Sequence, residues 1–344
     1  MKKYLLDPNK NSYKANLHCH TNLSDGCLSP EEMKKAYMEH GYSIIAYTDH
    51  DIMIDHSDLN EEGFLALRAF EMEVSEKKDF DAPGGRKTCH ACYIALEPDN
   101  FVQPMWCKDL RYLFGNAKTN AVKVVFDENE PDYRRVYSPE GVSDMLKRGR
   151  EKGFFVTYNH PRWSGENFEQ YGYYDGMHAM EICNYACYEG GHPEYNSGVY
   201  EEMLRAGKRI YCISADDNHN GSADKYHDSF GGFTVIKADK LEYRTITKAL
   251  EEGDFYASMG PEIHELYLED NILHVKCSPA KRICLNVGRT RYACKKKATV
   301  GEYITEASFA IDKEKDIYFR LDIYDENGNA ANTNAYFCDE VFES

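Results

Sequence analysis

The stretch of sequence that decides the fold lies near the N-terminus and reads Asn16-Leu17-His18-Cys19-His20-Thr21-Asn22-Leu23-Ser24-Asp25-Gly26. It brings three potential metal ligands, His18, His20 and Asp25, together within eight residues. Apolar residues alternate with others from Tyr13 to Cys19, which predicts a strand that carries the ligands at its C-terminal end. Because residues two apart point to the same side of a strand, His18 and His20 can bind one cation, whereas Asp25 follows a turn and reaches elsewhere.

The bulk composition is that of a globular protein. The chain has 344 residues, 42% of them apolar, which is enough for one large domain and a small second domain. Its formal net charge of -17 argues against a sequence-independent hold on nucleic acid, which needs a basic surface. We therefore expect a small substrate and no stable nucleic-acid binding. Divalent cations bound among the carboxylates would offset part of the negative charge.

Neither end of the chain nor its interior predicts a membrane segment. The N-terminal residues lack the apolar core and cleavage site of a signal peptide, and no window is apolar enough to span a membrane. The twelve cysteines are scattered, so we expect reduced, mostly buried thiols in a cytoplasmic protein. Cys89-His90-Ala91-Cys92 has the spacing of half a zinc site, but no second pair follows, which favours buried thiols. The oligomeric state is left open.

Helix and strand signals alternate along the first two thirds of the chain. Ser29-Pro30-Glu31-Glu32 predicts a capped helix that ends at Gly41, and Ser138-Pro139-Glu140 predicts another that ends at Gly153. Buried strands that lead into polar residues are predicted near 43–51, 154–158, 178–183 and 209–214. Strands that alternate with helices and carry ligands at their ends indicate a parallel α/β fold. Segment 100–137 has no sustained period and predicts a loop-rich excursion over the site.

The character of the sequence changes near Gly253. From Ile263 onward, short alternating runs are separated by turn residues, which predicts a small antiparallel β domain. We accordingly expect a hydrolase domain over residues 1–258 and an accessory β domain over residues 259–344.

Several short motifs with chemical potential follow one another in a fixed order. They are His18-x-His20-Thr21-x-x-Ser24-Asp25-Gly26, Thr48-Asp49-His50, Glu71, His90, Asn159-His160-Pro161 and Asp217-x-His219. In this order they resemble the motifs of the PHP (polymerase and histidinol phosphatase) superfamily, and the run from Ala249 to Pro279 resembles a branch with a C-terminal β appendage. The resemblance implies a distorted (β/α)7 TIM-like barrel whose C-terminal mouth holds two or three divalent metal ions.

The resemblance also implies how the ligands divide among the ions. One ion would be bound by His18, His20, Glu71 and Asp217. A second would share Glu71 and add His90 and His160, and a third would be bound by Asp25, His50 and His219. Independently of the resemblance, six imidazoles and three carboxylates suit Mn, Fe or Zn better than an all-oxygen Mg site. The ligand types do not rank these three metals.

Two of the carboxylate ligands have competitors in the sequence. Glu73 would face the same side of a strand as Glu71, and the family pattern of an aromatic residue followed by Glu favours Glu71. Asp216 precedes Asp217, but only Asp217 has the two-residue spacing to His219.

Other residues have open alternatives. His90 is flanked by cysteines and precedes its predicted strand instead of following one. Arg162 follows the Asn-His-Pro motif and can bind a phosphate oxygen through two N–H groups, or form a surface salt bridge. Glu181 can orient a ligand imidazole or make a simple strand-end hydrogen bond, and Trp163 can line the pocket or pack. The histidines without a partner pattern are interpreted as structural: His56, His178, His192, His227, His264 and His274.

These features favour a metal-dependent phosphoesterase. In this hypothesis a metal-bound hydroxide at a di- or trinuclear site attacks a phosphomonoester or nucleotide-type phosphoester. Asp217, His219 and Arg162 are the predicted catalytic residues, with Arg162 stabilising charge on the phosphoryl oxygens. The alternatives are an amidohydrolase-like C–N hydrolase and a non-catalytic metal-binding or interaction module.

Overall fold

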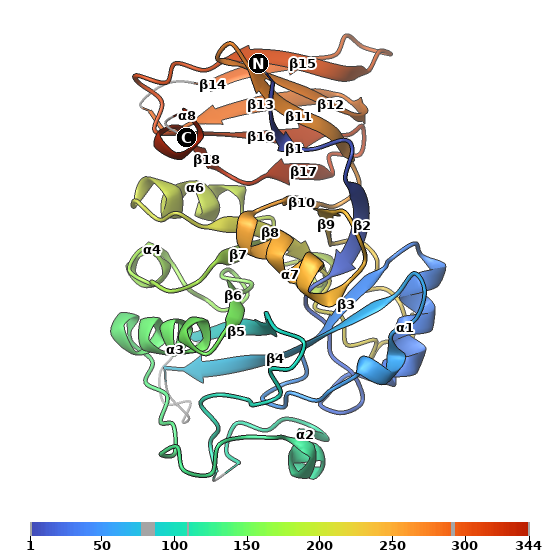
Figure 1. Cartoon of the computed structure of the whole chain (residues 1–344), viewed down its shortest axis with the longest axis vertical. Helices are drawn as coiled ribbons and strands as arrows, with labels where there is room; N and C mark the ends of the chain where they lie inside the picture. Colours follow the sequence, from blue (N-terminus) through green and yellow to red (C-terminus); the bar gives the residue numbers. More distant parts are fainter. Residues whose placement is uncertain (1, 77–86, 109, 290–292, 343–344) are drawn as a thin grey trace.

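The computed structural model describes residues 2–76, 87–108, 110–289 and 293–342. Figure 1 shows two regions stacked along the long axis of the molecule: one holds most of the helices, and the other is built mainly of strands and contains the C-terminus. This arrangement confirms the predicted mixed α/β class with a C-terminal antiparallel β region.

One long sheet runs through both regions. Its strand order is β14-β13-β16-β17-β10-β9-β2-β3-β4-β5-β6-β7-β8. The strands of the helix-containing region and its border are β2 (Asn11–Asn16), β3 (Ile44–Tyr47), β4 (Leu65–Ser75), β5 (Thr88–Ala95), β6 (Phe154–Tyr158), β7 (Ala179–Asn184), β8 (Tyr211–Ala215), β9 (Phe233–Ala238) and β10 (Phe255–Ser258). The strands β2, β3 and β4 run parallel to one another, and so do β6, β7 and β8.

Strand β5 departs from the strict strand-helix alternation that the resemblance implies. It pairs antiparallel with both β4 and β6, and Ser75 at the end of β4 lies opposite Thr88 at the start of β5. Parallel neighbours need a crossover of about a dozen residues or more, usually a helix, whereas β4 and β5 pair as a hairpin. The N-terminal part of β5, which carries His90, therefore lies beside the C-terminal ends of β4 and β6.

Alternate residues of strands β2 to β9 pack together in one shared hydrophobic cluster. The shared members are Ala15, Leu17, Ile44, Ala46, Leu65, Leu67, Ile94, Phe155, Ala179, Ile213 and Ile236, together with Ile246 and Leu250. Side chains from both ends of this series can pack together only because the sheet curls round on itself. An isolated parallel bridge between Cys19 and Asn218 joins the segments that follow β2 and β8. Polar residues at the strand ends are thereby gathered at one rim.

The helices begin where the sequence places caps. Ser29 accepts a hydrogen bond from the backbone N–H of Glu32, whose side chain returns to Ser29, and Ser138 caps the second predicted helix. The helices are α1 (Pro30–Glu39), η1 (Ser57–Leu59), α2 (Ala117–Asn120), η2 (Ala121–Lys123), α3 (Pro139–Glu151), α4 (Phe168–Tyr171), α5 (Tyr185–Glu189), α6 (Ser197–Arg205), α7 (Tyr243–Glu252) and α8 (Cys338–Phe342). Both predicted capped helices are confirmed.

The C-terminal region consists of antiparallel strands. They are β11 (Ile263–Glu269), β12 (Ile272–Ala280), β13 (Arg282–Val287), β14 (Ala293–Lys297), β15 (Ile304–Ala310), β16 (Tyr318–Tyr324), β17 (Ala330–Thr333) and β18 (Tyr336–Phe337). The N-terminal strand β1 (Lys3–Leu6) pairs with β11, so the start of the chain lies beside its last third (Figure 1). β10 pairs with both β9 and β17, which makes the long sheet continuous between the regions.

The loop-rich segment 100–137 packs against the ligand loop that follows β2. Asn116 donates from its backbone N–H to the carbonyl of Ser24 at 2.6 Å, and the Asn120 side chain donates to the carbonyl of Leu23. Gly115 has φ 50, and a Cβ there would lie 2.3 Å from the Ser24 carbonyl oxygen. The excursion is thus held close to Asp25.

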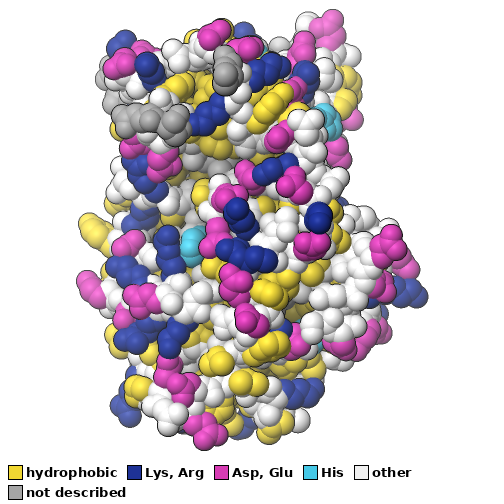
Figure 2. Space-filling model, in the orientation of Figure 1, with side chains coloured by type: hydrophobic (Ala, Val, Ile, Leu, Met, Phe, Trp, Pro, Cys, Tyr) yellow, Lys and Arg dark blue, Asp and Glu magenta, His cyan; other side chains and the backbone are white. Residues whose placement is uncertain are grey.

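The surface shown in Figure 2 carries interspersed acidic and basic side chains. Eleven cysteines in the described segments are free thiols, most of them buried, as expected for a chain without a disulfide framework. Among the described residues, none of the helices combines the length and apolarity needed to cross a bilayer.

Candidate metal centre

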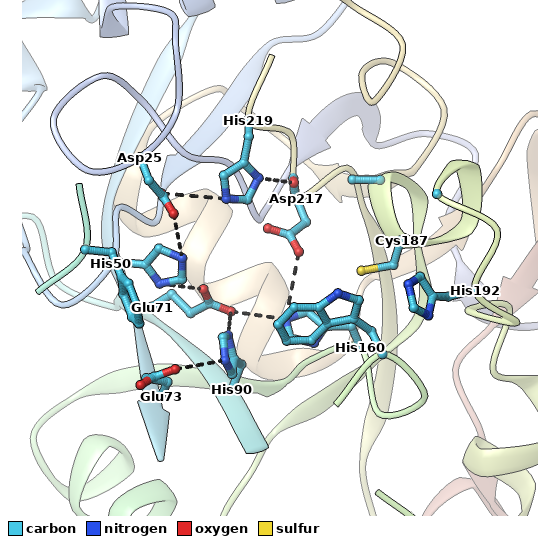
Figure 3. Close-up of a pocket in the computed structure, with 14 residues that line it drawn as sticks. Asp25, His50, Glu71, Glu73, His90, His160, Cys187, His192, Asp217 and His219 are labelled. Carbon is cyan, nitrogen blue, oxygen red and sulfur yellow. Dashed lines mark hydrogen bonds and ion pairs between the residues drawn. The ribbon is translucent and has the colours of Figure 1, made fainter. Parts of the chain in front are cut away.

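The predicted ligands come from separate elements and meet around one cavity (Figure 3). The cavity has a volume of about 460 Å³. Seven of the predicted ligands line it: Asp25, His50, Glu71, His90, His160, Asp217 and His219. The other two, His18 and His20, are fully buried and contact the carboxylates of this set. The structure therefore brings all nine residues together.

Glu71 on β4 lies at the centre of the cluster. Its two carboxylate oxygens lie 3.1 to 3.5 Å from imidazole nitrogens of His18, His20, His50, His90 and His160. The Asn159 side chain donates a further hydrogen bond to Oε1 at 3.0 Å. One buried carboxylate thus faces five imidazoles, a concentration of candidate metal ligands around a single side chain.

Asp217 faces the two histidines of the opening motif. Its Oδ1 lies 3.1 Å from His18 Nε2 and 3.0 Å from His20 Nε2, and its Oδ2 lies 3.8 Å from His160 Nε2. The backbone of Asp217 has φ 55, in the left-handed region that a non-glycine residue rarely adopts. Such strain is concentrated at functional sites, where the surrounding structure enforces it. Here its backbone N–H donates to the His18 carbonyl at 2.8 Å, which fixes the strained residue.

Asp25 faces a different part of the cluster. Its Oδ1 lies 3.6 Å from His219 Nε2 and its Oδ2 lies 3.5 Å from His50 Nε2. His219 Nδ1 donates to the carbonyl of Asp217 at 3.0 Å, which leaves Nε2 as the nitrogen directed at Asp25. In this tautomer the unprotonated Nε2 is available to a metal.

Four overlapping groups of these side chains each bring their ligand atoms within 4.8 Å of one another. They are His20-Asp25-His50-His219, His18-Glu71-His160, His18-His20-Asp217 and His50-Glu71-His90. The grouping of Asp25, His50 and His219 matches the implied third set, with His20 added. His90 and His160, implied to share one ion, fall into separate groups that both contain Glu71. The division of ligands among ions stays a prediction.

The unmet hydrogen-bonding needs of this cluster fit a metal ion. Within the described residues, five buried atoms of the cluster have no partner in hydrogen-bonding geometry, although each lies 3.0 to 3.7 Å from a group of opposite charge type: His20 Nδ1, His50 Nδ1, His90 Nδ1, His90 Nε2 and Asp217 Oδ1. Leaving a buried polar atom unpaired costs about 1–3 kcal/mol, so the accumulation of such atoms is costly without a ligand. Imidazole and carboxylate donors suit a divalent transition metal.

Glu181 on β7 holds two of the ligand residues in place. Its Oε1 accepts a hydrogen bond from His18 Nδ1 at 2.6 Å, and its Oε2 accepts the backbone N–H of His160 at 3.0 Å. The Asn184 side chain bridges Glu181 Oε2 and Asp217 Oδ2 at 2.9 and 3.0 Å. A carboxylate that accepts the outer N–H of a ligand imidazole fixes its tautomer and orientation. Of the two alternatives left by the sequence, the orienting contact is the one observed.

The electrostatics of the cluster couple imidazoles to carboxylates. Burial alone would lower the pKa of His90, but Glu71 and Glu73 raise it to about 10. Burial likewise opposes the charge on His219, whereas Asp25 and Asp217 raise its pKa to about 9. The pKa of Glu71 lies well below its ordinary value despite burial, because His18 and His90 favour the anion. A cation at this position would take the place of protons on the imidazoles.

The structure separates the two neighbouring aspartates. Asp216 accepts hydrogen bonds from the backbone N–H groups of Phe230, Gly231 and Gly232, at 2.7 to 3.0 Å, and one from Tyr37. Burial raises the pKa of Asp216 to about 7 although these donors lower it. Its role is to hold the loop before β9, and Asp217 alone of the pair faces the cluster.

Arg162 does not line the cavity. Its side chain is exposed and interacts with the hydroxyl of Tyr171, and its backbone N–H donates to Glu194 at 3.3 Å. The neighbouring Trp163 does line the cavity, and its ring centroid lies 4.9 Å from that of His160. For Arg162 to contact a phosphoryl group, its side chain would have to leave Tyr171.

Several cavity residues carry no signal in the sequence. Phe114 comes from the loop-rich excursion, and Cys187 and His192 come from α5 and the turn after it. His192, interpreted from the sequence as structural, lies with Cys187 on the side of the cavity opposite Asp25 and His50 (Figure 3). These residues follow no ligand spacing, so only the folding of distant segments reveals them.

Comparisons with known proteins point to one family. A model of the PHP domain matches residues 16–235, which is well over half of the chain. A comparison with curated proteins gives no match.

A search of solved structures also gave matches. A two-domain protein of Bacteroides vulgatus containing a predicted PHP-like metal-dependent phosphoesterase is 15% identical, with a TM-score of 0.45 over 97% of this chain and 98% of its own. A proposed metal-dependent phosphoesterase of Bifidobacterium adolescentis is 16% identical, with a TM-score of 0.38 over 60% of this chain and 87% of its own. An amidohydrolase of Chromobacterium violaceum with bound sulfate is 18% identical, with a TM-score of 0.37 and the same coverage.

The matched segment begins at Asn16, in the opening motif, and runs past His219, so it contains every residue of the cluster. The order of motifs in the sequence and their convergence on Glu71 agree with that match, and the chain belongs to the PHP domain family.

Proposed function

We propose that this protein is a metal-dependent phosphoesterase that hydrolyses a small phosphomonoester or nucleotide-type phosphoester. The single observation that carries the proposal is the buried Glu71 carboxylate, which faces five imidazoles beside an open cavity. Such a cluster serves no evident packing purpose, because it concentrates charged and polar groups that are costly to bury unpaired.

We propose that the nine ligands hold two or three divalent Mn, Fe or Zn ions. His18, His20 and Asp217 would hold one ion and Asp25, His50 and His219 another, and Glu71, His90 and His160 would complete the ligand set. Bound ions would supply Lewis acidity and lower the pKa of a water molecule toward neutrality. The donor chemistry specifies a divalent transition metal and does not choose among Mn, Fe and Zn.

The chain's own residues would position the substrate and manage charge. His219 and Asp25 are partly exposed at the cavity, where a phosphoryl group can enter, whereas His18 and His20 are fully buried. Asp217 and His219 would lie closest to the reacting atoms and Glu181 would keep His18 oriented. Asp217 is fixed by its backbone contact to His18 and by Asn184, so little reorganisation is needed during reaction.

We also propose that the curled sheet from β2 to β9 is the distorted (β/α)7-type barrel that the resemblance implies. The shared core from all of these strands and the bridge between Cys19 and Asn218 support closure. Residues 1–258 would form the hydrolase domain and 259–344 the accessory β domain, to which the first strand contributes through its pairing with β11.

The test is metal content and turnover in two purified variants. We expect the wild type to contain about two to three equivalents of transition metal by elemental analysis and to release phosphate from a panel of phosphoesters. His18→Ala should lose both while keeping its circular dichroism spectrum. His274→Ala, on β12 and bonded to Ser308, is the matched control and should keep both. Full turnover by metal-replete His18→Ala, or turnover of amides and lactams without phosphoesters, would overturn the proposal.

A further inference from the structure

Two large aromatic side chains that line the cavity are exposed. Trp163 is 44% exposed and Phe114 is 39% exposed. They come from segments about fifty residues apart in the sequence, the turn after β6 and the loop-rich excursion. Large apolar side chains that stay open to solvent inside a concave site are typical of ligand contacts.

Trp163 is exposed but firmly anchored. Its backbone N–H donates to Oε2 of Glu194 at 2.8 Å, and Glu194 is itself fully buried and bonded to the Asn196 side chain at 2.7 Å. The indole also packs edge-on to His90 and His160, at centroid distances of 5.4 and 4.9 Å. A rigid ring of this kind loses little conformational entropy when it binds a ligand.

Phe114 is anchored by a different device. The next residue, Gly115, adopts φ 50 and lies so close to Ser24 that a side chain would clash with the Ser24 carbonyl. Asn116 then bonds to the same carbonyl at 2.6 Å. The Phe114 ring is thereby held with its centroid 5.0 Å from the His50 ring. Two independent anchors therefore present two aromatic rings to one cavity.

The remaining lining of the cavity limits what else could hold a substrate. Among the described residues that line it there are four carboxylates and five imidazoles, and none is Lys or Arg. The volume of about 460 Å³ lies within the range of about 300–1,000 Å³ that is usual for whole small-molecule ligands. The part of a substrate beyond its phosphoryl group must then be held mainly by ring and apolar contacts.

We infer that Trp163 and Phe114 form a leaving-group subsite that selects phosphoesters whose leaving group carries a planar aromatic ring. This inference rests on the proposed phosphoesterase function, because the phosphoryl group would be held at the ligand cluster. The two residues determine specificity and are assigned no part in bond cleavage.

The experiment compares benzyl phosphate with cyclohexylmethyl phosphate, which have the same number of carbon atoms and both release a primary alcohol. The change in the ratio of their kcat/KM values between the wild type and a variant isolates the contact with a planar ring, because any intrinsic difference in leaving-group reactivity cancels. It is measured for the metal-loaded wild type, Trp163→Leu and Phe114→Leu. Tyr173→Leu is the control, because Tyr173 is 66% exposed but does not line the cavity. Binding of benzylphosphonate and cyclohexylmethylphosphonate, which cannot be hydrolysed at an ester bond, is measured in parallel.

The wild type should favour the benzyl ester, and Trp163→Leu should reduce that ratio by about tenfold, the size of one aromatic contact. Phe114→Leu should reduce it in the same direction, and Tyr173→Leu should leave it unchanged. A wild-type ratio near one, or a ratio unaltered in both Leu variants, would overturn the inference and leave the proposed function standing. Conversely, the absence of turnover of either ester, with selective binding of benzylphosphonate that Trp163→Leu abolishes, would refute the phosphoesterase and keep the subsite. Failure to bind either phosphonate would refute the subsite as well.

Discussion

Glu181→Gln is the substitution that tests most directly how the fold supports the metal centre. The Glu181 carboxylate is fully buried and accepts hydrogen bonds from His18 Nδ1 at 2.6 Å, the His160 backbone at 3.0 Å and Asn184 at 2.9 Å. Glutamine keeps the size of the side chain, but it removes the negative charge and turns one acceptor atom into a donor. It therefore cannot satisfy all three donors.

The expected loss follows from these contacts. Carboxylates that orient a ligand imidazole typically contribute about 10- to 100-fold in metal affinity or activity. This range corresponds to about 1.4–2.7 kcal/mol, close to the value of one hydrogen bond to a charged group. Because Glu181 contacts both His18 and His160, we expect the upper half of the range, about 30- to 100-fold weaker metal binding.

The assay is competition for Zn²⁺ or Mn²⁺ against a chromogenic chelator at neutral pH, with turnover measured on the same samples. Glu166→Gln is the matched control. Its carboxylate is equally buried, but its hydrogen bonds come from the hydroxyl groups of Tyr137 and Tyr158, at 2.7 and 2.6 Å, and of Tyr174, and none comes from a proposed ligand. Both variants should lose stability in urea titrations, whereas only Glu181→Gln should lose metal affinity. Metal affinity within twofold of the wild type in Glu181→Gln would refute the orienting role.

Two further predictions concern the backbone and the pH dependence of stability. Gly115→Ala forces a Cβ to within 2.3 Å of the Ser24 carbonyl at a left-handed φ, so urea unfolding should show a loss of about 1–3 kcal/mol; an unchanged midpoint would contradict the close approach. The pKa of His178 is lowered to about 4 by burial and by Arg150, and neutral Nδ1 accepts the Val156 backbone N–H at 3.1 Å. In the unfolded chain the imidazole has a pKa of about 6.5, so its contribution is present above that pH and is lost as the pH falls toward 4. Between pH 7 and 4.5 the wild type should lose about 2 kcal/mol more than His178→Gln in urea titrations, and equal losses would show that His178 titrates normally.

The fold was readable from the sequence wherever a signal is local. The capping box at Ser29 and the second cap at Ser138 specify helices through hydrogen bonds that span three residues, and both helices begin there. Strand β5 shows the limit of such reasoning. Its apolar run predicts a strand but not the direction of that strand, which is decided by antiparallel pairing with β4 and β6.

The direction of β5 also explains the ligand that the sequence made least secure. His90 precedes most of its strand, and in a parallel sheet it would lie at the far edge from the other ligands. Because β5 is antiparallel, its beginning meets the end of β4, where Glu73 lies opposite His90 in the sheet register. His90 therefore reaches the cluster from the start of its strand, a position from which it would not reach the other ligands in a parallel sheet.

The sequence by itself determined most of the candidate metal ligands. The spacing of His18 and His20 on one strand, and of Asp217 and His219, marks candidate ligands because side-chain direction within a few residues follows from backbone geometry alone. Only the tertiary structure decided that Asp216 binds backbone amides, that Arg162 lies outside the cavity, and that Glu71 joins five imidazoles. It also brought Phe114 and Trp163 to the same cavity. The physical reason is that these relations depend on contacts between segments many residues apart, and such contacts are fixed by the packing of the curled sheet as a whole.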